Sequence, residues 1–175
     1  MSGLAIRRLA NGEATVARLA EILSETVSAG GSVHFMDPVP MAEARAYWAG
    51  ALADADADGR ITLGGYLDDR LVGTVTLYLD TPPNQPFRAE IWKLMVAPSA
   101  RGRGIARALM IEAERLAVDA GRTLLNLDTA VEGGASELYE QLGWVRAGVI
   151  PDYAFKPQGG LVGTAIYYKR IGGAG

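Results

Sequence analysis

The 175-residue sequence contains no cysteine and one histidine, His34. The lack of cysteine excludes disulfides, a thiolate nucleophile and a cysteine-ligated metal, and one histidine cannot build an imidazole-rich metal site. No segment approaches the roughly 18 uninterrupted apolar residues of a membrane span, and Arg7 and Arg8 interrupt the apolar start that a signal peptide needs. We therefore expect a cytoplasmic protein that binds neither a membrane nor a metal.

Basic residues are too few and too scattered for a nucleic-acid-binding protein. The 17 Lys and Arg residues are outnumbered by 20 Asp and Glu, and the pI is about 5.2. Non-specific affinity for nucleic acid comes mainly from Lys and Arg that neutralise phosphates. Because the composition, 49% hydrophobic and 21% charged, is that of a folded chain, we expect a single domain over residues 1–175 with a small-molecule partner.

Apolar residues recur at helical or alternating spacing along most of the chain. Alternation and β-branched residues predict about seven strands, over residues 4–8, 61–67, 71–79, 89–96, 124–129, 145–149 and 164–169. Helical spacing predicts about four helices, with apolar faces over residues 16–27, 44–52, 105–120 and 135–142. Irregular loops are expected at 31–40, 81–86 and 151–163. An early hairpin followed by strand–helix–strand order predicts an α/β fold with a mixed sheet.

An acidic segment, Asp54-x-Asp56-x-Asp58-Gly59, matches the start of an EF-hand calcium loop. The twelfth position is Gly65 instead of a bidentate glutamate, and strand-like residues follow instead of a helix. We therefore expect a solvated acidic turn here and no metal site.

The stretch from Leu94 to Ala106 carries the clearest chemical signal, because an apolar strand runs through a Gly/Arg loop into a helix. A helix N-terminus has unpaired N–H groups and a partial positive charge, and glycines let a ligand approach the backbone. Arg101 and Arg103 add cationic donors, so a pyrophosphate fits this loop. A plain tight connection with solvated arginines is the alternative. No Gly-Lys-Ser/Thr follows, so the loop is not a P-loop, and Arg107 stands where a dinucleotide fingerprint needs a small residue.

The pattern Arg101-x-x-Gly104-x-Ala106, preceded by Val-x-Pro, resembles the acetyl-CoA-binding signature of the GCN5-related N-acetyltransferase (GNAT) family. The segment from Leu138 to Trp144 resembles the family's Leu-Tyr-x-x-Leu-Gly-Phe segment. Within the family, the sequence is most similar to the tabtoxin-resistance acetyltransferase branch, at residues 93–96, 99–104, 127–129 and 164–167. The chain departs from the family at Glu132, where an asparagine is frequent.

This resemblance implies a GNAT-like sheet with splayed fourth and fifth strands and a direct transfer of acetyl from acetyl-CoA to an amine or hydroxyl. The pantetheine arm would lie along Leu94, Met95 and Val96. The pyrophosphate would lie on the backbone of the loop and helix start, formed by Arg101, Gly102, Arg103, Gly104, Ile105 and Ala106.

The resemblance also implies an acid and a base. Tyr139 stands where the family often places the general acid that protonates the CoA thiolate, although a buried aromatic covering the sheet is the alternative. Asp128 is the first candidate for the base, and Glu90 and Asp152 are the others. Each carboxylate could instead serve as a cap or an ion-pair partner.

The loop at 31–40 often borders the acceptor pocket in this family, so His34 and Phe35 are candidate substrate contacts together with Asp152, with ordinary packing as the alternative. We expect a small amino-acid-like or antibiotic-like acceptor. The rival functions are a peptide N-terminal acetyltransferase and a non-catalytic acyl-CoA-binding sensor. A homodimer through paired strand edges is also expected.

Overall fold

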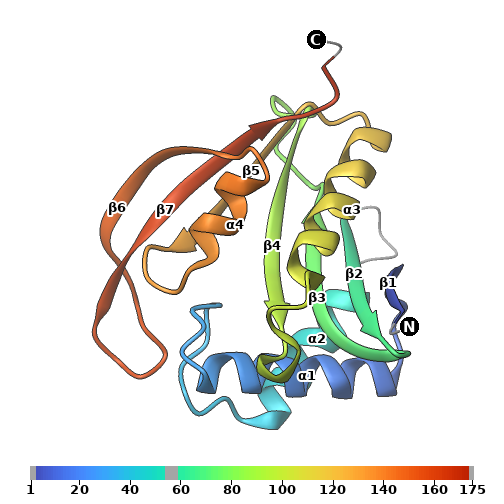
Figure 1. The fold of residues 1–175 in the computed structure, drawn as a ribbon, viewed down its shortest axis with the longest axis vertical. Coiled ribbons are helices and arrows are strands. Elements are labelled where there is room, and N and C mark those ends of the chain that lie inside the picture. The colour runs from blue at the N-terminus through green and yellow to red at the C-terminus, as the bar shows by residue number, and fades with distance from the viewer. Residues whose placement is uncertain (1–2, 54–58, 174–175) are drawn as a thin grey trace.

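A computed structural model of the protein describes residues 3–53 and 59–173 (Figure 1). Its seven strands form one sheet in the order β1-β2-β3-β4-β5-β7-β6. The strands are β1 (Leu4–Arg8), β2 (Arg60–Leu67), β3 (Arg70–Tyr78), β4 (Arg88–Val96), β5 (Leu124–Ala130), β6 (Val145–Phe155) and β7 (Leu161–Arg170). The α-helices are α1 (Glu13–Ser28), α2 (Met41–Ala53), α3 (Ile105–Asp119) and α4 (Ala135–Gln141). The predicted mixed α/β fold is confirmed.

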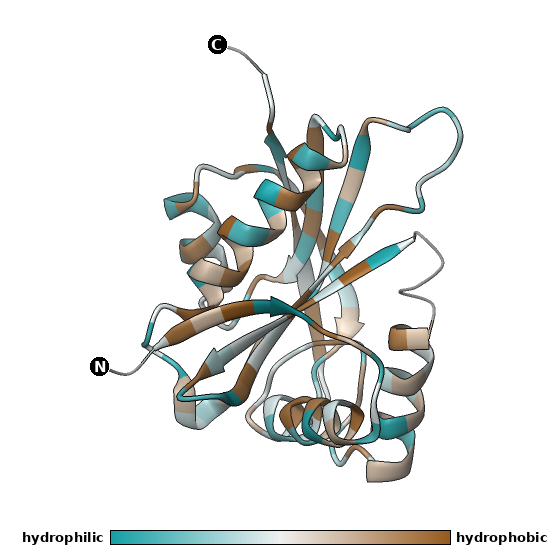
Figure 2. Cartoon of the chain, turned by 90° about the vertical axis from the view of Figure 1, so that its right-hand side faces the viewer, coloured by the Kyte–Doolittle hydropathy of each residue, from teal (hydrophilic) through white to brown (hydrophobic). Residues whose placement is uncertain are grey.

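The helices cover both faces of the β1–β4 half of the sheet. Figures 1 and 2 show α3 on one side of these strands and α1 with α2 on the other. Each helix buries the apolar stripe that its sequence spacing predicts, such as Leu19, Leu23 and Val27 of α1. None of the described helices is long and apolar enough to cross a bilayer.

The β2–β3 hairpin confirms the early hairpin that the sequence predicts, and its turn consists of Asp68 and Asp69. Both residues have positive φ, 50° and 59°, as a two-residue type I′ turn requires. The turn places Gly65 opposite Gly73 in the antiparallel register. A Cβ on Gly73 would lie 3.0 Å from the carbonyl oxygen of Met95 and 3.1 Å from Ile105 Cγ2. The missing side chains therefore let α3 pack close to the sheet.

Strands β4 and β5 pair in parallel over a short stretch and then diverge. Residues Arg88 to Glu90 pair with Leu124 to Asn126, and the two strands separate beyond that point (Figure 1). The Arg88 guanidinium donates to Glu90 and, at 2.6 Å, to Asn126 Oδ1, so it joins the strands where they are still paired. The splayed fourth and fifth strands are confirmed, and they leave a V-shaped opening.

A β-bulge alters β4 where it borders this opening. Thr76 pairs with Trp92 and Thr74 with Met95, so Lys93 and Leu94 together face one residue of β3. Lys93 has the left-handed φ of 54° that such an extra residue can adopt. A bulge changes the direction in which side chains point. The side chains of β4 therefore do not alternate strictly between the two faces of the sheet at this position.

The C-terminal hairpin is longer than the sequence predicts, and the expectation of one irregular loop over 151–163 was wrong. Strand β6 continues to Phe155 and β7 begins at Leu161. A register shift between Ile150 and Ala154 accommodates Pro151, which lacks an N–H, and Asp152, whose φ is 52°. Pro151 therefore marks an irregularity within β6 and does not end the strand.

The turn between β6 and β7 contacts the first helix and the loop that follows it. Gln158 Nε2 donates to the carbonyl of Val27 at 3.1 Å, and the Asp37 amide donates to the carbonyl of Pro157 at 3.0 Å. These contacts connect the two halves of the molecule across the V. Residues 54–58, which include all three aspartates of the predicted acidic turn, lie outside the described residues.

We expect Gly73→Ala to lower the free energy of unfolding by about 1–3 kcal/mol, because the added methyl group overpacks against a backbone carbonyl and α3. Gly50→Ala is the matched control. Gly50 is exposed in α2 with no atom within 4 Å of its Cβ, so alanine should raise stability by about 0.5–1 kcal/mol. Urea unfolding of both variants measures the difference, and equal effects would contradict the close approach of α3.

Candidate active site

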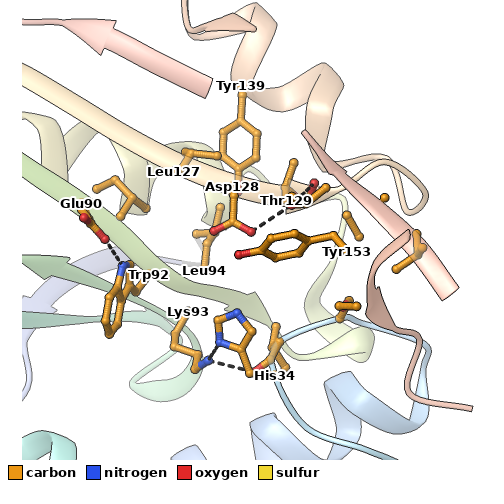
Figure 3. A pocket seen from close by; sticks show the side chains of 18 residues that line it. His34, Glu90, Trp92, Lys93, Leu94, Leu127, Asp128, Thr129, Tyr139 and Tyr153 are labelled. Atoms are coloured by element: carbon orange, nitrogen blue, oxygen red, sulfur yellow. Dashed lines mark hydrogen bonds between the residues drawn. The ribbon is translucent and has the colours of Figure 1, made fainter. Parts of the chain in front are cut away.

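Two adjoining cavities occupy the opening between β4 and β5. The outer cavity, of about 580 Å³, lies among the end of β4, the loop before α3 and the start of α4. The other cavity, here called the inner cavity, has a volume of about 260 Å³ and lies between β4, β5 and the β6–β7 hairpin (Figure 3). Both are lined by Ser32, Val33, Leu94, Thr129, Ala130 and Tyr139. The cavities therefore meet at these residues.

The Gly/Arg loop forms one wall of the outer cavity. Gly102 and Gly104 have φ of 76° and 77°, and no atom lies within 4 Å of a Cβ built on either. Gly104 is the N-cap of α3, whose first amides have no carbonyl one turn earlier to bond. This wall offers free backbone N–H groups and the positive end of a helix dipole to an anion.

Two arginines complete that wall. The sequence indicated Arg101 and Arg103, whereas Arg101 and Arg107 line the cavity. Arg101 lines the cavity and donates to the Val96 carbonyl at 3.3 Å. Arg107 also lines it and donates to Gln141 Oε1 at 3.1 Å, which links α3 to α4. Arg103 is not among the lining residues. Ile105 and Ala106 line the cavity at the start of α3.

The end of β4 forms a second wall, with Leu94, Met95 and Val96 as lining residues. Because β5 pairs with β4 only as far as Glu90, this edge of β4 faces the cavity instead of a neighbouring strand. Its backbone groups can therefore bond an extended amide-containing chain as a β-strand would.

Glu132 lies where the chain departs from the family pattern, beside the Gly133-Gly134 entrance to α4. Its carboxylate accepts from Lys156 Nζ at 3.1 Å. Both side chains are exposed, so this ion pair offsets only part of the negative charge that Glu132 brings to the cavity.

Tyr139 lines both cavities and therefore stands where they meet; Figure 3 shows it above Asp128 in the inner cavity. The side chain is 5% exposed and packs against Trp144 and Tyr167, with ring centroids 6.1 and 5.7 Å away. Burial, followed by the nearby Asp128 charge and Tyr167, raises the pKa of Tyr139 above its usual value of 10. The phenol therefore stays protonated through neutral pH and can act as an acid.

Two predicted carboxylates line the inner cavity with different partners. Asp128 Oδ2 accepts from Thr164 Oγ1 at 2.9 Å and the residue is exposed to the cavity. Glu90 accepts from Arg88 through one oxygen and from Trp92 Nε1, at 2.8 Å, through the other. Asp128 thus keeps acceptor capacity for a ligand, whereas both oxygens of Glu90 are engaged.

Two predicted acceptor contacts lie elsewhere. Asp152 sits in the irregular part of β6 and is exposed, and its neighbour Tyr153 lines the inner cavity instead. Phe35 does not line the cavity and packs edge-on against Tyr47, at 5.4 Å and 83° between the rings. His34 does line the inner cavity, and its role as a substrate contact stays a prediction.

Lys93 is a site residue that the sequence analysis missed. Its Nζ lies 2.8 Å from the Val33 carbonyl and 2.8 Å from His34 Nδ1. Burial lowers the pKa of Lys93 to about 8 despite the opposing Asp128 charge. Burial and then Lys93 lower the pKa of His34, again against Asp128. The motif that contains Lys93 was visible in the sequence, but the bulge that turns it into the cavity was not.

The acetyltransferase (GNAT) family model matches residues 18–144. An uncharacterized N-acetyltransferase from the hisH-hisA intergenic region of Azospirillum brasilense is 32% identical over 112 residues. That alignment covers 63% of this chain and 65% of the relative, so the chain matches slightly less than two thirds of the relative's length.

Solved structures share the fold at low sequence identity. An N-acetyltransferase from Staphylococcus aureus Mu50 superposes with a TM-score of 0.81 at 19% identity, over 97% of this chain and 99% of the other. A putative acetyltransferase from Salmonella typhimurium, solved with its cofactor acetyl-CoA, has a TM-score of 0.77 at 18% identity, over 95% and 93%. The tabtoxin-resistance branch stays a prediction. With most of its length matched by the family model and its fold shared with these enzymes, the chain belongs to the acetyltransferase (GNAT) family.

Proposed function

We propose that the protein transfers the acetyl group of acetyl-CoA directly to a small amino-acid-like or antibiotic-like acceptor, on an amine or a hydroxyl. The observation that carries this proposal is the meeting of the two cavities at Leu94 and Tyr139. One cavity has the chemistry for a pyrophosphate and an extended amide arm, and the other holds a carboxylate. The Salmonella neighbour that was solved with acetyl-CoA supports the same cosubstrate.

In this proposal the outer cavity holds acetyl-CoA. The amides at the start of α3 and the Arg101 and Arg107 side chains face the pyrophosphate, and the open edge of β4 bonds the pantetheine amides. A backbone N–H at the Leu94 end of this edge polarises the thioester carbonyl, which is the oxyanion stabilisation that acyl transfer needs.

The inner cavity then holds the acceptor and the groups that move protons. An ammonium cannot attack, so Asp128 first accepts one proton from the acceptor ammonium. The neutral amine then attacks the thioester carbonyl carbon and forms the N–C bond, and the C–S bond breaks. Tyr139 gives its proton to the departing sulfur, and the second proton of the acylated nitrogen restores the Tyr139 phenol, while Asp128 releases its proton to solvent. Because a thiol ionises near pH 8.5, a phenol with a raised pKa remains protonated until the thiolate forms.

The shape of the inner cavity favours a small acceptor over a peptide. Its volume of about 260 Å³ lies at the low end for small-molecule sites. The β6–β7 turn is hydrogen-bonded to α1 and to the loop before α2. These contacts close that side of the opening to the N-terminus of a peptide acceptor. An acyl-CoA sensor needs neither Asp128 nor Tyr139 beside a second cavity, so their common placement favours an enzyme.

Tyr139→Phe should lower kcat by about 10²–10⁴-fold, because no acid remains for the thiolate, while the Kd for acetyl-CoA stays near the wild-type value. Asp128→Asn should lower kcat in the same way. Glu90→Gln should have a smaller effect, since both oxygens of Glu90 are already bonded. CoA release measured with a thiol reagent reports turnover free of protein background, because the chain has no cysteine.

Tyr66→Phe is the matched control for loss of a phenol, since Tyr66 lies on β2 under the Arg7 guanidinium and lines neither cavity. Turnover that is unchanged in Tyr139→Phe would reject the assigned acid. Equal losses in Asp128→Asn and Glu90→Gln would reject the choice between the carboxylates.

Ala106→Glu should weaken acetyl-CoA binding by about tenfold or more, because it adds a negative charge beside the proposed pyrophosphate site in the first turn of α3. Ile111→Glu adds the same charge to the exposed side of that helix and should bind acetyl-CoA normally. Calorimetric titration gives both constants. Similar affinities in the two variants would place the pyrophosphate elsewhere.

The proposed assembly is a homodimer through β6, the strand at the end of the sheet order. Its exposed apolar side chains are Val145, Val149, Ile150, Tyr153 and Phe155. An unpaired edge of this kind is a template for pairing with a second copy. Light scattering at micromolar concentration should give twice the monomer mass, and Ile150→Lys should give a monomer. A wild-type monomer would contradict this assembly.

A further inference from the structure

Lys93 and His34 form the floor of the inner cavity, opposite Asp128. Figure 3 shows both side chains on the side of the cavity away from Asp128 and Tyr139. They come from different elements, the β4 bulge and the loop between α1 and α2, and both have left-handed φ, 54° and 72°. Strained residues of this kind persist where the surrounding structure holds them in place, and they cluster at ligand sites.

The hydrogen bonds of this pair leave one N–H donor on each side chain. An ammonium has three N–H groups, and two of those on Lys93 are directed at the Val33 carbonyl and His34 Nδ1. When His34 Nδ1 accepts, its Nε2 carries the ring proton. Figure 3 shows that second ring nitrogen pointing toward the side where Asp128 and Tyr153 lie. The floor thus offers the remaining Lys93 N–H and the His34 Nε2–H.

The charge of Lys93 has no counter-ion close by. The chain has three lysines. Lys156 pairs with Glu132 at 3.1 Å and Lys169 with Glu114 at 2.6 Å. Among the described residues no carboxylate lies within 4.0 Å of Lys93 Nζ, and its other neighbours are the rings of Phe35 and Tyr47, at 5.7 and 5.5 Å. A partly buried cation without a paired anion is costly to the fold and complementary to an anionic ligand group.

We propose that Lys93 and His34 bind the carboxylate of the acceptor, which is an amino acid whose amine points toward Asp128 and Tyr139. This inference rests on the proposed function and narrows its acceptor class. Glu90 also lines the cavity but is paired with Arg88, so the Asp128 carboxylate and the Lys93 ammonium are the charged groups left for a ligand, and a zwitterion matches both. A polyamine or an aminoglycoside would place a cation against Lys93, which disfavours these acceptors.

The test is calorimetric binding of L-amino acids, including β- and γ-amino acids, and of their carboxamides to the protein with CoA present, where no transfer takes place. We expect at least one amino acid to bind about tenfold or more tightly than its amide. Lys93→Met, which keeps a stem against the aromatic rings, should remove that preference. Lys93→Arg should retain part of it, and Arg45→Met, which removes an exposed cation on α2, should retain all of it.

Lysine ¹³Cε NMR gives a readout that a structural role would not change. Among three lysine signals, the one absent from Lys93→Met should titrate near pH 8 in the free protein. His34, Tyr47 and Asp128 are the titratable groups that face Lys93. A bound carboxylate should raise this midpoint, because it stabilises the ammonium, whereas the amide should leave it in place.

The outcomes separate the inference from the proposed function. Amides that bind as tightly as acids, equal losses of both in Lys93→Met, or an unmoved Lys93 midpoint would overturn the carboxylate site. If amines without a carboxylate are acetylated as efficiently, the inference fails and the acetyltransferase stands. A protein that binds amino acids as expected but neither binds acetyl-CoA nor releases CoA would retain the carboxylate site and lose the proposed function.

Discussion

The short parallel pairing of β4 with β5 is the constraint on which the rest of the site depends. Arg88 joins Glu90 to Asn126 at the last paired residues, and the strands diverge from there. Because each strand twists and the bulge at Lys93 and Leu94 bends β4 further, the gap cannot be closed by backbone hydrogen bonds. The unpaired edge is thereby available to a ligand, and both cavities open along it.

Placement of charge follows from this geometry. The positive end of α3 and two arginines face the outer cavity, where Glu132 is paired with Lys156. The inner cavity instead separates the Asp128 carboxylate on β5, which has no cationic partner among the described residues, from the Lys93 ammonium on β4. The two strands diverge far enough that Asp128 and Lys93 do not form an ion pair with each other. Both charged groups can therefore bind a ligand. Glu90 lies where the strands are still paired, and there it accepts from Arg88.

Support for the site comes from elements far from it in sequence. Tyr139 is held by Trp144 and Tyr167, and Trp144 Nε1 in turn donates to Glu114 of α3 at 2.9 Å. The β6–β7 turn bonds to α1 on the other side of the opening. These contacts join the two halves of the sheet, which are otherwise connected only by the short pairing of β4 with β5. They therefore limit movement of one half relative to the other. Because Tyr139 is positioned by packing, its proposed role as a proton donor requires that these neighbouring elements hold it in place.

The sequence by itself determined the class of fold, the order of the strands and helices, the Gly/Arg loop and the family, because periodicity and motif spacing are local properties of the chain. It also indicated Asp128, Tyr139 and His34 as candidates, which the fold brings to one cavity. Only the tertiary structure decided that Lys93 lies there, that Arg107 instead of Arg103 lines the outer cavity, and that Phe35 and Asp152 line neither. The physical reason is that a bulge, a register shift or a left-handed residue changes where a side chain points without changing the local pattern of apolar and polar residues.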